Sequence, residues 1–168
     1  MNFETKATVQ VDDTTGEIEG IAWPFGTADR VGDMIEKGAF AGAALPVPML
    51  DSHDQKQPVG VWTHLEETAE GLVVKGRLLV NEVARAREVQ ALVKAGALGG
   101  LSIGFSSKKA IIRKGGGRTI QALDLVEISL VSVPCHPGAR VRGAKAAANA
   151  IALAEAIQRA AAALTPNV

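Results

Sequence analysis

Cysteine and histidine are scarce in this sequence, which has one cysteine, Cys135, and three histidines among its 168 residues. A single cysteine cannot form an internal disulfide, and the histidines show none of the Cys/His spacing that is typical of a structural zinc site. We therefore expect no metal site of this kind. A reducing, cytoplasm-like compartment suits such a chain best.

The sequence also lacks an excess of either charge and any long apolar run. Lys and Arg number 18, as do Asp and Glu, so the formal net charge is zero. No block of like charge indicates nucleic-acid or membrane-surface binding, which leaves proteins as the expected partners. No apolar stretch reaches the ~18 residues needed to span a bilayer, and residues 1–6 lack a signal-peptide pattern. We expect a soluble protein that is not secreted by the general route.

Apolar residues make up 47 % of the sequence, which is ample for one core. The length fits one domain of about 100 to 200 residues. From residue 143 the composition shifts to alanine, and apolar residues at a three-four spacing predict a helix over residues 143–164. We predict a compact domain over residues 1–142 and an Ala-rich helical tail over 143–168. The tail either packs on the domain or serves as a tether or partner-binding helix.

Short segments of extended pattern dominate the predicted domain. Two helices are expected, a short one over 35–44 and a longer one over 81–96 that begins at Asn81 and stops at Gly96. About eight short strands with one good helix favour a mainly β fold with helices (α+β), a barrel or a sandwich. The predicted strands and hairpins are a hairpin over 4–23, strands over 47–50, 59–64, 72–80 and 98–105, a hairpin of 110–113 with 119–123 around a glycine turn at 115–117, and a strand over 125–133.

Few residues here could carry out chemistry. A hydroxyl nucleophile needs a base, a third group that orients the base, and donors for the developing oxyanion. His53 lies where a predicted strand meets a polar loop, and Ser102 lies among Gly99, Gly100 and Gly104, which would leave room for a substrate backbone. The alternative for Ser102 is a serine on a buried strand near a glycine bulge. Residues 100–104 match Gly-x-Ser-x-Gly, but no strong helix follows, so we reject the α/β-hydrolase elbow.

Glu127 is a carboxylate on an otherwise apolar predicted strand. It alternates in phase with Ser129 and other residues of a partly buried face, where an unpaired carboxylate would be costly. A histidine that donates its ring N–H would pair with it and would also fix the tautomer that a general base needs. A salt bridge to Arg113 or Arg118 is an equally good alternative on this reasoning.

The other polar candidates carry less weight. His64 is most simply a half-exposed strand residue, whereas His136 follows the Glu127 strand and could serve as a reserve orienting group. Asp51 and Asp54 flank the candidate histidine, but neighbours on a strand usually point away from one another. Cys135 is an alternative nucleophile next to a histidine, yet adjacent residues seldom form a working pair.

An ordered set of motifs over about residues 5–142 resembles the prohead, or capsid-maturation, proteases of tailed bacteriophages, which share a fold with the herpesvirus assemblins. No single piece is decisive, but the order of the pieces is specific. The motifs are Gly20-Ile21-Ala22, Lys37-Gly38-Ala39-Phe40, Leu50-Asp51-Ser52-His53-Asp54, Pro58-Val59-Gly60, Gly71-Leu72, the segment from Ala97 to Phe105, and Leu125-Val126-Glu127-Ile128-Ser129-Leu130-Val131-Ser132-Val133-Pro134.

The resemblance implies a serine protease in which His53 is the histidine, Ser102 the nucleophile and Glu127 the acidic member. It implies a herpesvirus-protease-like β-barrel surrounded by helices, no metal or organic cofactor, and a homo-dimer or higher homo-oligomer. The expected substrates are the scaffold or scaffold-like segment of the major capsid protein and the protease itself, inside the assembling procapsid in the host cytoplasm. Two alternatives stay open: a catalytically idle capsid-assembly scaffold of the same fold, and a small cytoplasmic esterase.

Overall fold

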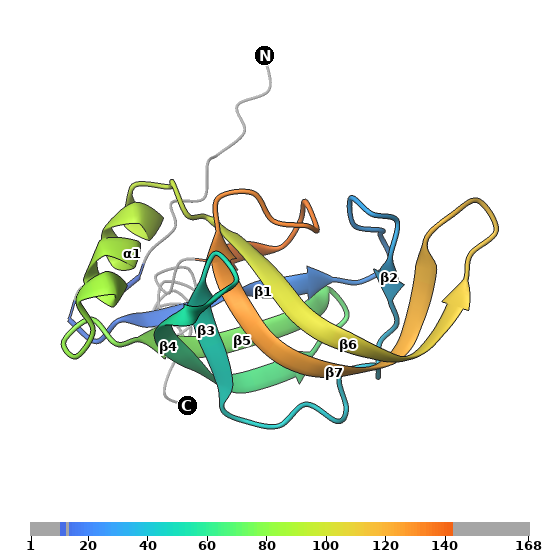
Figure 1. The fold of residues 1–168 in the computed structure, drawn as a ribbon, viewed down its shortest axis with the longest axis horizontal. Helices are drawn as coiled ribbons and strands as arrows, with labels where there is room; N and C mark the ends of the chain where they lie inside the picture. The colour runs from blue at the N-terminus through green and yellow to red at the C-terminus, as the bar shows by residue number, and fades with distance from the viewer. Residues whose placement is uncertain (1–10, 13, 143–168) are drawn as a thin grey trace, which may run out of the picture.

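Eight strands and one helix make up the part of the chain that the structure, a computed structural model, describes, namely residues 11, 12 and 14–142 (Figure 1). The first arm of the predicted N-terminal hairpin, up to residue 10, and the predicted helix over 143–164 lie outside these residues. In chain order the elements are β1 (Glu17–Pro24), β2 (Met34–Ile35), β3 (Val47–Asp51), β4 (Asp54–Glu67), β5 (Gly71–Leu78), α1 (Ala84–Lys94), β6 (Gly100–Ile112), β7 (Arg118–Val131) and β8 (Arg140–Arg142).

Seven of these strands close into a barrel. Their hydrogen-bonded order is β7-β3-β4-β5-β1-β8-β6, and β6 pairs again with β7, which completes the ring. The β3–β7 pairing is parallel, whereas the other pairings within the ring are antiparallel. The short strand β2 adds to β7 outside the ring, at Thr119 and Ile120. The sequence left a barrel and a sandwich open, and the closing β6–β7 pair decides for the barrel.

The barrel interior holds the hydrophobic core. Trp62 is completely buried there, and its indole N–H donates to the carbonyl oxygen of Ile128 at 3.0 Å, which ties β4 to β7 across the core. Such a bond satisfies the one polar atom of a large apolar side chain. Other fully or nearly fully buried core side chains are Met49, Leu72, Val74, Leu78, Leu101, Ile120, Ile128 and Leu130.

Strands β6 and β7 are longer than the sequence predicted. The segments predicted as separate strands over 98–105 and 110–113 form one strand, and so do those over 119–123 and 125–133. Register shifts at Gly104/Phe105 and near Ser107 break the two-residue alternation, which is why the pattern read as two pieces. The predicted turn at residues 115–117 is present, with positive φ at all three glycines. The paired strands form a long hairpin that reaches beyond the barrel (Figure 1).

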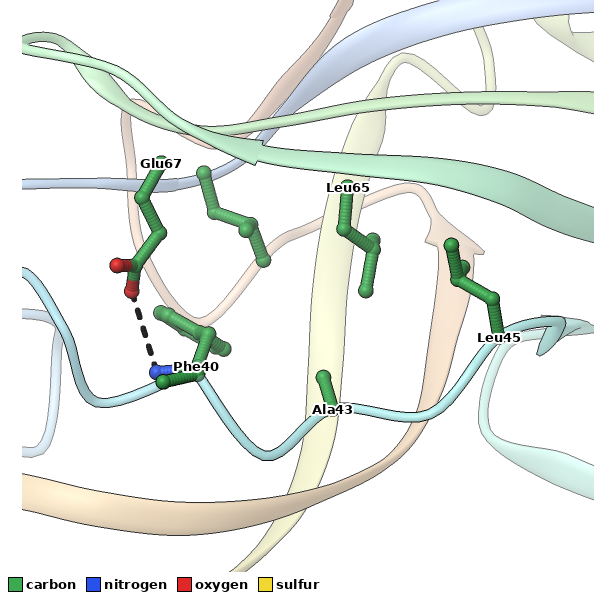
Figure 2. Close-up of a pocket in the computed structure, with 7 residues that line it drawn as sticks. Phe40, Ala43, Leu45, Leu65 and Glu67 are labelled. Atoms are coloured by element: carbon green, nitrogen blue, oxygen red, sulfur yellow. Dashed lines mark hydrogen bonds between the residues drawn. The ribbon is translucent and has the colours of Figure 1, made fainter.

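The helix predicted over residues 35–44 is wrong. Ile35 ends strand β2, and residues 37–42 form successive turns instead of a helix. Gly38 has a φ of +98°, and the carboxylate of Glu67 accepts hydrogen bonds from the Gly38 and Phe40 backbone nitrogens at 2.7 and 3.1 Å. Figure 2 shows the Glu67–Phe40 bond at a cavity of about 280 Å³. A distant side chain thus replaces the helical bonds that local spacing favours.

Helix α1 lies inside the range predicted for it, residues 81–96. It begins after Val83, whereas Asn81 was predicted to begin it, and Gly96 at φ +79° follows its end as expected. Its buried face, Ala86, Val89 and Val93, packs on the core. The fold class is therefore mainly β as predicted, but α1 is the only helix within the described ranges, so helices surrounding the barrel are not seen there. No helix of residues 11, 12 and 14–142 is long and apolar enough to cross a membrane.

Candidate active site

The candidate histidine lies in the tight turn between β3 and β4. Ser52 and His53 both have positive φ values, 53° and 62°, which non-glycine residues seldom adopt. The Ser52 backbone nitrogen donates to the Leu130 carbonyl oxygen at 3.0 Å, so the turn is fixed against β7. The His53 side chain is 45 % exposed, which leaves the ring open to solvent while its backbone is held.

A second anchor holds this turn from the side of helix α1. The Asp51 carboxylate, which is buried, accepts hydrogen bonds from Arg85 Nε at 2.8 Å and from Ser52 Oγ at 2.9 Å. Arg85 also pairs with Glu88 at 2.6 Å. Asp51 was considered as an orienting group for His53, but it is bonded to Arg85 instead, and Asp54 accepts from the Lys56 backbone.

Glu127 is in direct contact with His53. The His53 Nδ1 and Glu127 Oε1 atoms are 2.6 Å apart, and the glutamate is only 7 % exposed. An ionised carboxylate only accepts hydrogen bonds, so this contact requires a proton on Nδ1. The sequence left Arg113 and Arg118 as alternative partners, but Arg118 pairs with Asp33 and Arg113 donates to a backbone carbonyl.

Ser129 is a polar residue of this site that the sequence analysis did not single out. Its hydroxyl donates to Glu127 Oε2 at 2.6 Å and accepts the backbone N–H of His53 at 3.0 Å. The residue is completely buried. The signal in the sequence was the alternation that places it two residues from Glu127, on the same face of β7.

Ser102 lies on β6 directly opposite Ser129. Facing residues of an antiparallel pair have their Cβ atoms about 4.5 to 5.5 Å apart, so Ser102 is next to the residue that binds the His53 backbone. No residue of the described ranges forms a hydrogen bond with the Ser102 hydroxyl. The side chain lines a small cavity of about 40 Å³, together with Trp23, Cys135 and His136.

Two of the glycines around Ser102 lie against other parts of the protein. A Cβ atom at Gly104 would come within 2.4 Å of Glu127 Oε1, and one at Gly100 would come within 2.7 Å of Pro134. These two positions make room for parts of the protein itself. Only Gly99 is open, with no other atom closer than 3.9 Å to such a Cβ.

The loop after β1, which contains Thr27, and the loop after β7, which contains His136, meet beside Ser102. His136 is buried, with Nε2 near Thr27 Oγ1 at 3.1 Å and Nδ1 accepting the Gly138 backbone N–H at 3.1 Å. Burial lowers the pKa of His136, because desolvation disfavours the imidazolium. The reserve orienting role predicted for His136 is not seen, since the bonds of its ring in the described part of the chain go to Thr27 and Gly138 and not to His53.

The remaining candidates are not placed for catalysis. The Cys135 thiol donates to Asp29 at 3.2 Å, and burial together with this carboxylate raises the pKa of the thiol, which disfavours a nucleophilic thiolate. His64 lies at the surface and pairs with Glu66 at 3.5 Å. The cavity of Figure 2 contains none of the candidate residues. Among the residues that the structure describes, no group of three or more His, Cys, Asp or Glu side chains could hold a metal ion.

The barrel is the fold of a herpesvirus protease. The KSHV protease in complex with a hexapeptide phosphonate inhibitor superposes with a TM-score of 0.53 at 13 % sequence identity, covering 74 % of this chain and 63 % of that chain. At this identity the likeness establishes the fold alone.

The chain belongs to the caudovirus prohead serine protease family, whose model matches residues 2–154. It is 34 % identical over 151 residues to the prohead protease of Enterobacteria phage HK97, covering 84 % of this chain and 66 % of that protein. It is 31 % identical over 150 residues to the capsid polyprotein of Pseudomonas phage PAJU2, covering 85 % of this chain and 22 % of that protein. The chain thus spans less than two thirds of each relative. The family resemblance predicted from the ordered motifs is confirmed.

Proposed function

We propose that this chain is a serine endopeptidase with Ser102 as nucleophile, His53 as general base and Glu127 as the orienting carboxylate. The observation that carries the proposal is the 2.6 Å contact between His53 Nδ1 and Glu127 Oε1. On the same strand as Glu127, two residues further on, Ser129 lies opposite Ser102. With Nδ1 protonated, Nε2 is the ring nitrogen with a free lone pair. An imidazole held between a carboxylate and a hydroxyl is the arrangement that activates a serine.

The proposed reaction is hydrolysis of a peptide bond through an acyl-enzyme. His53 Nε2 accepts the Ser102 proton as Oγ attacks the carbonyl carbon, and then returns that proton to the leaving amine. A water molecule, activated in the same way, releases the acyl group. Glu127 stabilises the imidazolium that forms in each step. These steps use protein groups and water, and they need no cofactor.

Backbone N–H groups of the loop after β7 are the candidate donors to the oxyanion. Cys135 and His136 line the cavity beside Ser102, and their backbone nitrogens donate to no acceptor in the described part of the chain. By contrast, the Gly138 and Ala139 nitrogens both bond to His136. Unused donors beside a nucleophile are what stabilisation of a tetrahedral intermediate requires.

The proposed substrates are the scaffold or scaffold-like segment of the major capsid protein, and the chain itself. The names of the two relatives, a prohead protease and a capsid polyprotein, support a capsid protein as substrate. Cleavage then takes place inside the assembling procapsid in the host cytoplasm. We also propose a homo-dimer or higher homo-oligomer, which sedimentation of the purified chain measures.

The test compares the wild type with Ser102→Ala, using a candidate capsid precursor and a fluorophosphonate probe. The wild type is expected to cleave the precursor and to carry the probe on Ser102, as located by mass spectrometry. Ser102→Ala is expected to lose both, with a rate at least about 1,000-fold lower, as for other triad nucleophiles. Ser106→Ala is the matched control, because Ser106 is an exposed serine on the same strand.

Two outcomes would contradict the proposal. Equal cleavage by the wild type and Ser102→Ala would place the chemistry elsewhere. Absence of both cleavage and labelling in a folded wild type would favour the idle capsid-assembly scaffold instead.

A further inference from the structure

Ser129 closes a ring of hydrogen bonds that joins the backbone and the side chain of His53. The His53 backbone N–H donates to Ser129 Oγ at 3.0 Å, and Ser129 Oγ donates to Glu127 Oε2 at 2.6 Å. The other oxygen of the same carboxylate, Oε1, contacts His53 Nδ1 at 2.6 Å. Each group in the ring therefore has a partner inside it.

The direction of each bond in this ring is fixed by chemistry. A backbone N–H can only donate, so it occupies a lone pair of Ser129 Oγ and leaves the hydroxyl proton for another acceptor. That acceptor is Glu127 Oε2, since a carboxylate only accepts. With Oε2 engaged, the carboxylate is held in one rotation, and Oε1 faces the imidazole. This set of hydrogen bonds is thus compatible with a proton on Nδ1 of His53.

Burial makes this arrangement sensitive to the loss of one hydroxyl. Ser129 is 0 % exposed and Glu127 is 7 % exposed, so little water can replace a missing partner. Removal of Oγ would leave both the His53 N–H and Glu127 Oε2 without the partner that they now have. The turn at risk is the one in which Ser52 and His53 have left-handed backbone conformations.

We propose that Ser129 is a positioning residue that keeps His53 in the Nδ1–H tautomer with Nε2 free to act as the base. This inference rests on the proposed function, in which His53 activates Ser102. Ser129 does not touch the reacting atoms. It acts through Glu127, whose carboxylate it orients, and through the His53 backbone, which it anchors.

The direct test measures the tautomer of His53 by ¹⁵N–¹H NMR of the imidazole. The measurement is made in the Ser102→Ala protein, where no cleavage can complicate the spectra, at a pH where the ring is neutral. The parent protein is expected to show Nδ1–H as the predominant form. Adding Ser129→Ala is expected to raise the Nε2–H fraction several-fold, whereas Ser129→Thr, which retains the hydroxyl, is expected to restore the parent spectrum.

The second test measures the kinetics of peptide cleavage with an intact Ser102. Ser129→Ala is expected to lower kcat by about 10- to 100-fold, the size expected from one lost hydrogen bond to a charged group, and to change KM by less than about 3-fold. Glu127→Ala gives the decrease in kcat when the orienting carboxylate is absent, and the decrease in kcat caused by Ser129→Ala should be smaller. Ser132→Ala is the matched control, because Ser132 is an exposed serine just beyond the end of the same strand.

The outcomes separate this inference from the proposed function. An active wild type whose Ser129→Ala variant keeps both the Nδ1–H tautomer and kcat would overturn the role of Ser129 and leave the protease intact. A wild type that cleaves nothing would instead overturn the proposed function. If Ser129→Ala does not fold, Ser129→Cys, which is similar in shape but a weak donor, is measured in its place, and parent-like values would again overturn the inference.

Discussion

At the scale of single residues, this site shows how far a polar side chain can depend on a neighbour that is remote in sequence. Glu127 is tolerated in a buried position because His53 and Ser129 together bind both of its oxygens. The glycine opposite it, Gly104, is required because a side chain there would collide with that carboxylate. A glycine near a candidate nucleophile therefore does not by itself indicate a place for substrate.

His136 makes a prediction about pH at this scale. Burial lowers its pKa from the ordinary value of 6.5, so the folded state disfavours the charged ring. The unfolded chain binds more protons than the folded chain below about pH 6.5, and the contribution of His136 to stability is therefore complete above that pH and is lost as the pH falls through the folded pKa. Urea unfolding at pH 8 and at pH 5.5 should show that the wild type loses more stability than His136→Gln.

The difference between the two proteins isolates His136, because the other titrating groups are common to both. His53 and His64 are present in each protein and their contributions cancel. An equal loss of stability in the wild type and the variant would show that the buried ring does not carry the effect.

At the scale of elements, the β3–β4 turn is held between β7 and helix α1. Asp51 connects the turn to α1 through Arg85, with which it forms bonds at 2.8 and 2.6 Å. Helix α1 is therefore coupled to the position of His53 through one ion pair, although no residue of the helix is a candidate for catalysis.

Asp51→Asn tests this coupling. The change keeps the size of the side chain but removes its charge, so the ion pair between the turn and Arg85 is lost. We expect kcat to fall by about 10-fold, which corresponds to roughly the strength of one hydrogen bond to a charged group. Glu88→Gln is the control, since it removes the other carboxylate bound to Arg85 at 2.6 Å but lies outside the turn. Equal kinetics for the two variants would argue against the coupling.

At the scale of the whole molecule, closure of the barrel by β6 and β7 assembles the site. Ser102 and Glu127 come from the two closing strands, and His53 comes from the turn after β3, which pairs with β7. Residues 53, 102 and 127 come from three strands or turns, so the candidate site needs both the β3–β7 and the β6–β7 pairing. Catalysis under the proposed function therefore requires the complete barrel.

Cooperative unfolding of the barrel is the prediction at this scale. Trp23 on β1 and Trp62 on β4 are buried in one core, so their fluorescence and the far-UV circular dichroism should change at the same urea concentration. The measurement uses Ser102→Ala, in which self-cleavage is removed. Trp62→Phe leaves Trp23 as the single tryptophan reporter. Distinct midpoints for the two signals would show that parts of the barrel unfold separately.

Much of this protein was determined by the sequence itself. Period-two alternation predicted most strands, the glycines predicted the 115–117 turn and the end of α1, and the ordered motifs predicted the family. His53 and Glu127 were singled out because a polar group at a strand end and a carboxylate on an apolar strand are unusual locally. Such features depend only on neighbours within a few residues along the chain, so they can be recognised from the sequence.

Only the tertiary structure decided how these features combine. It selected His53 over Arg113 and Arg118 as the partner of Glu127, assigned Gly104 to that carboxylate, and brought Ser129 into the site. It also replaced the predicted helix over residues 35–44 with turns bonded to Glu67. Each of these depends on contacts between segments remote in sequence, and local pattern has no information about which strands the closing barrel will bring together.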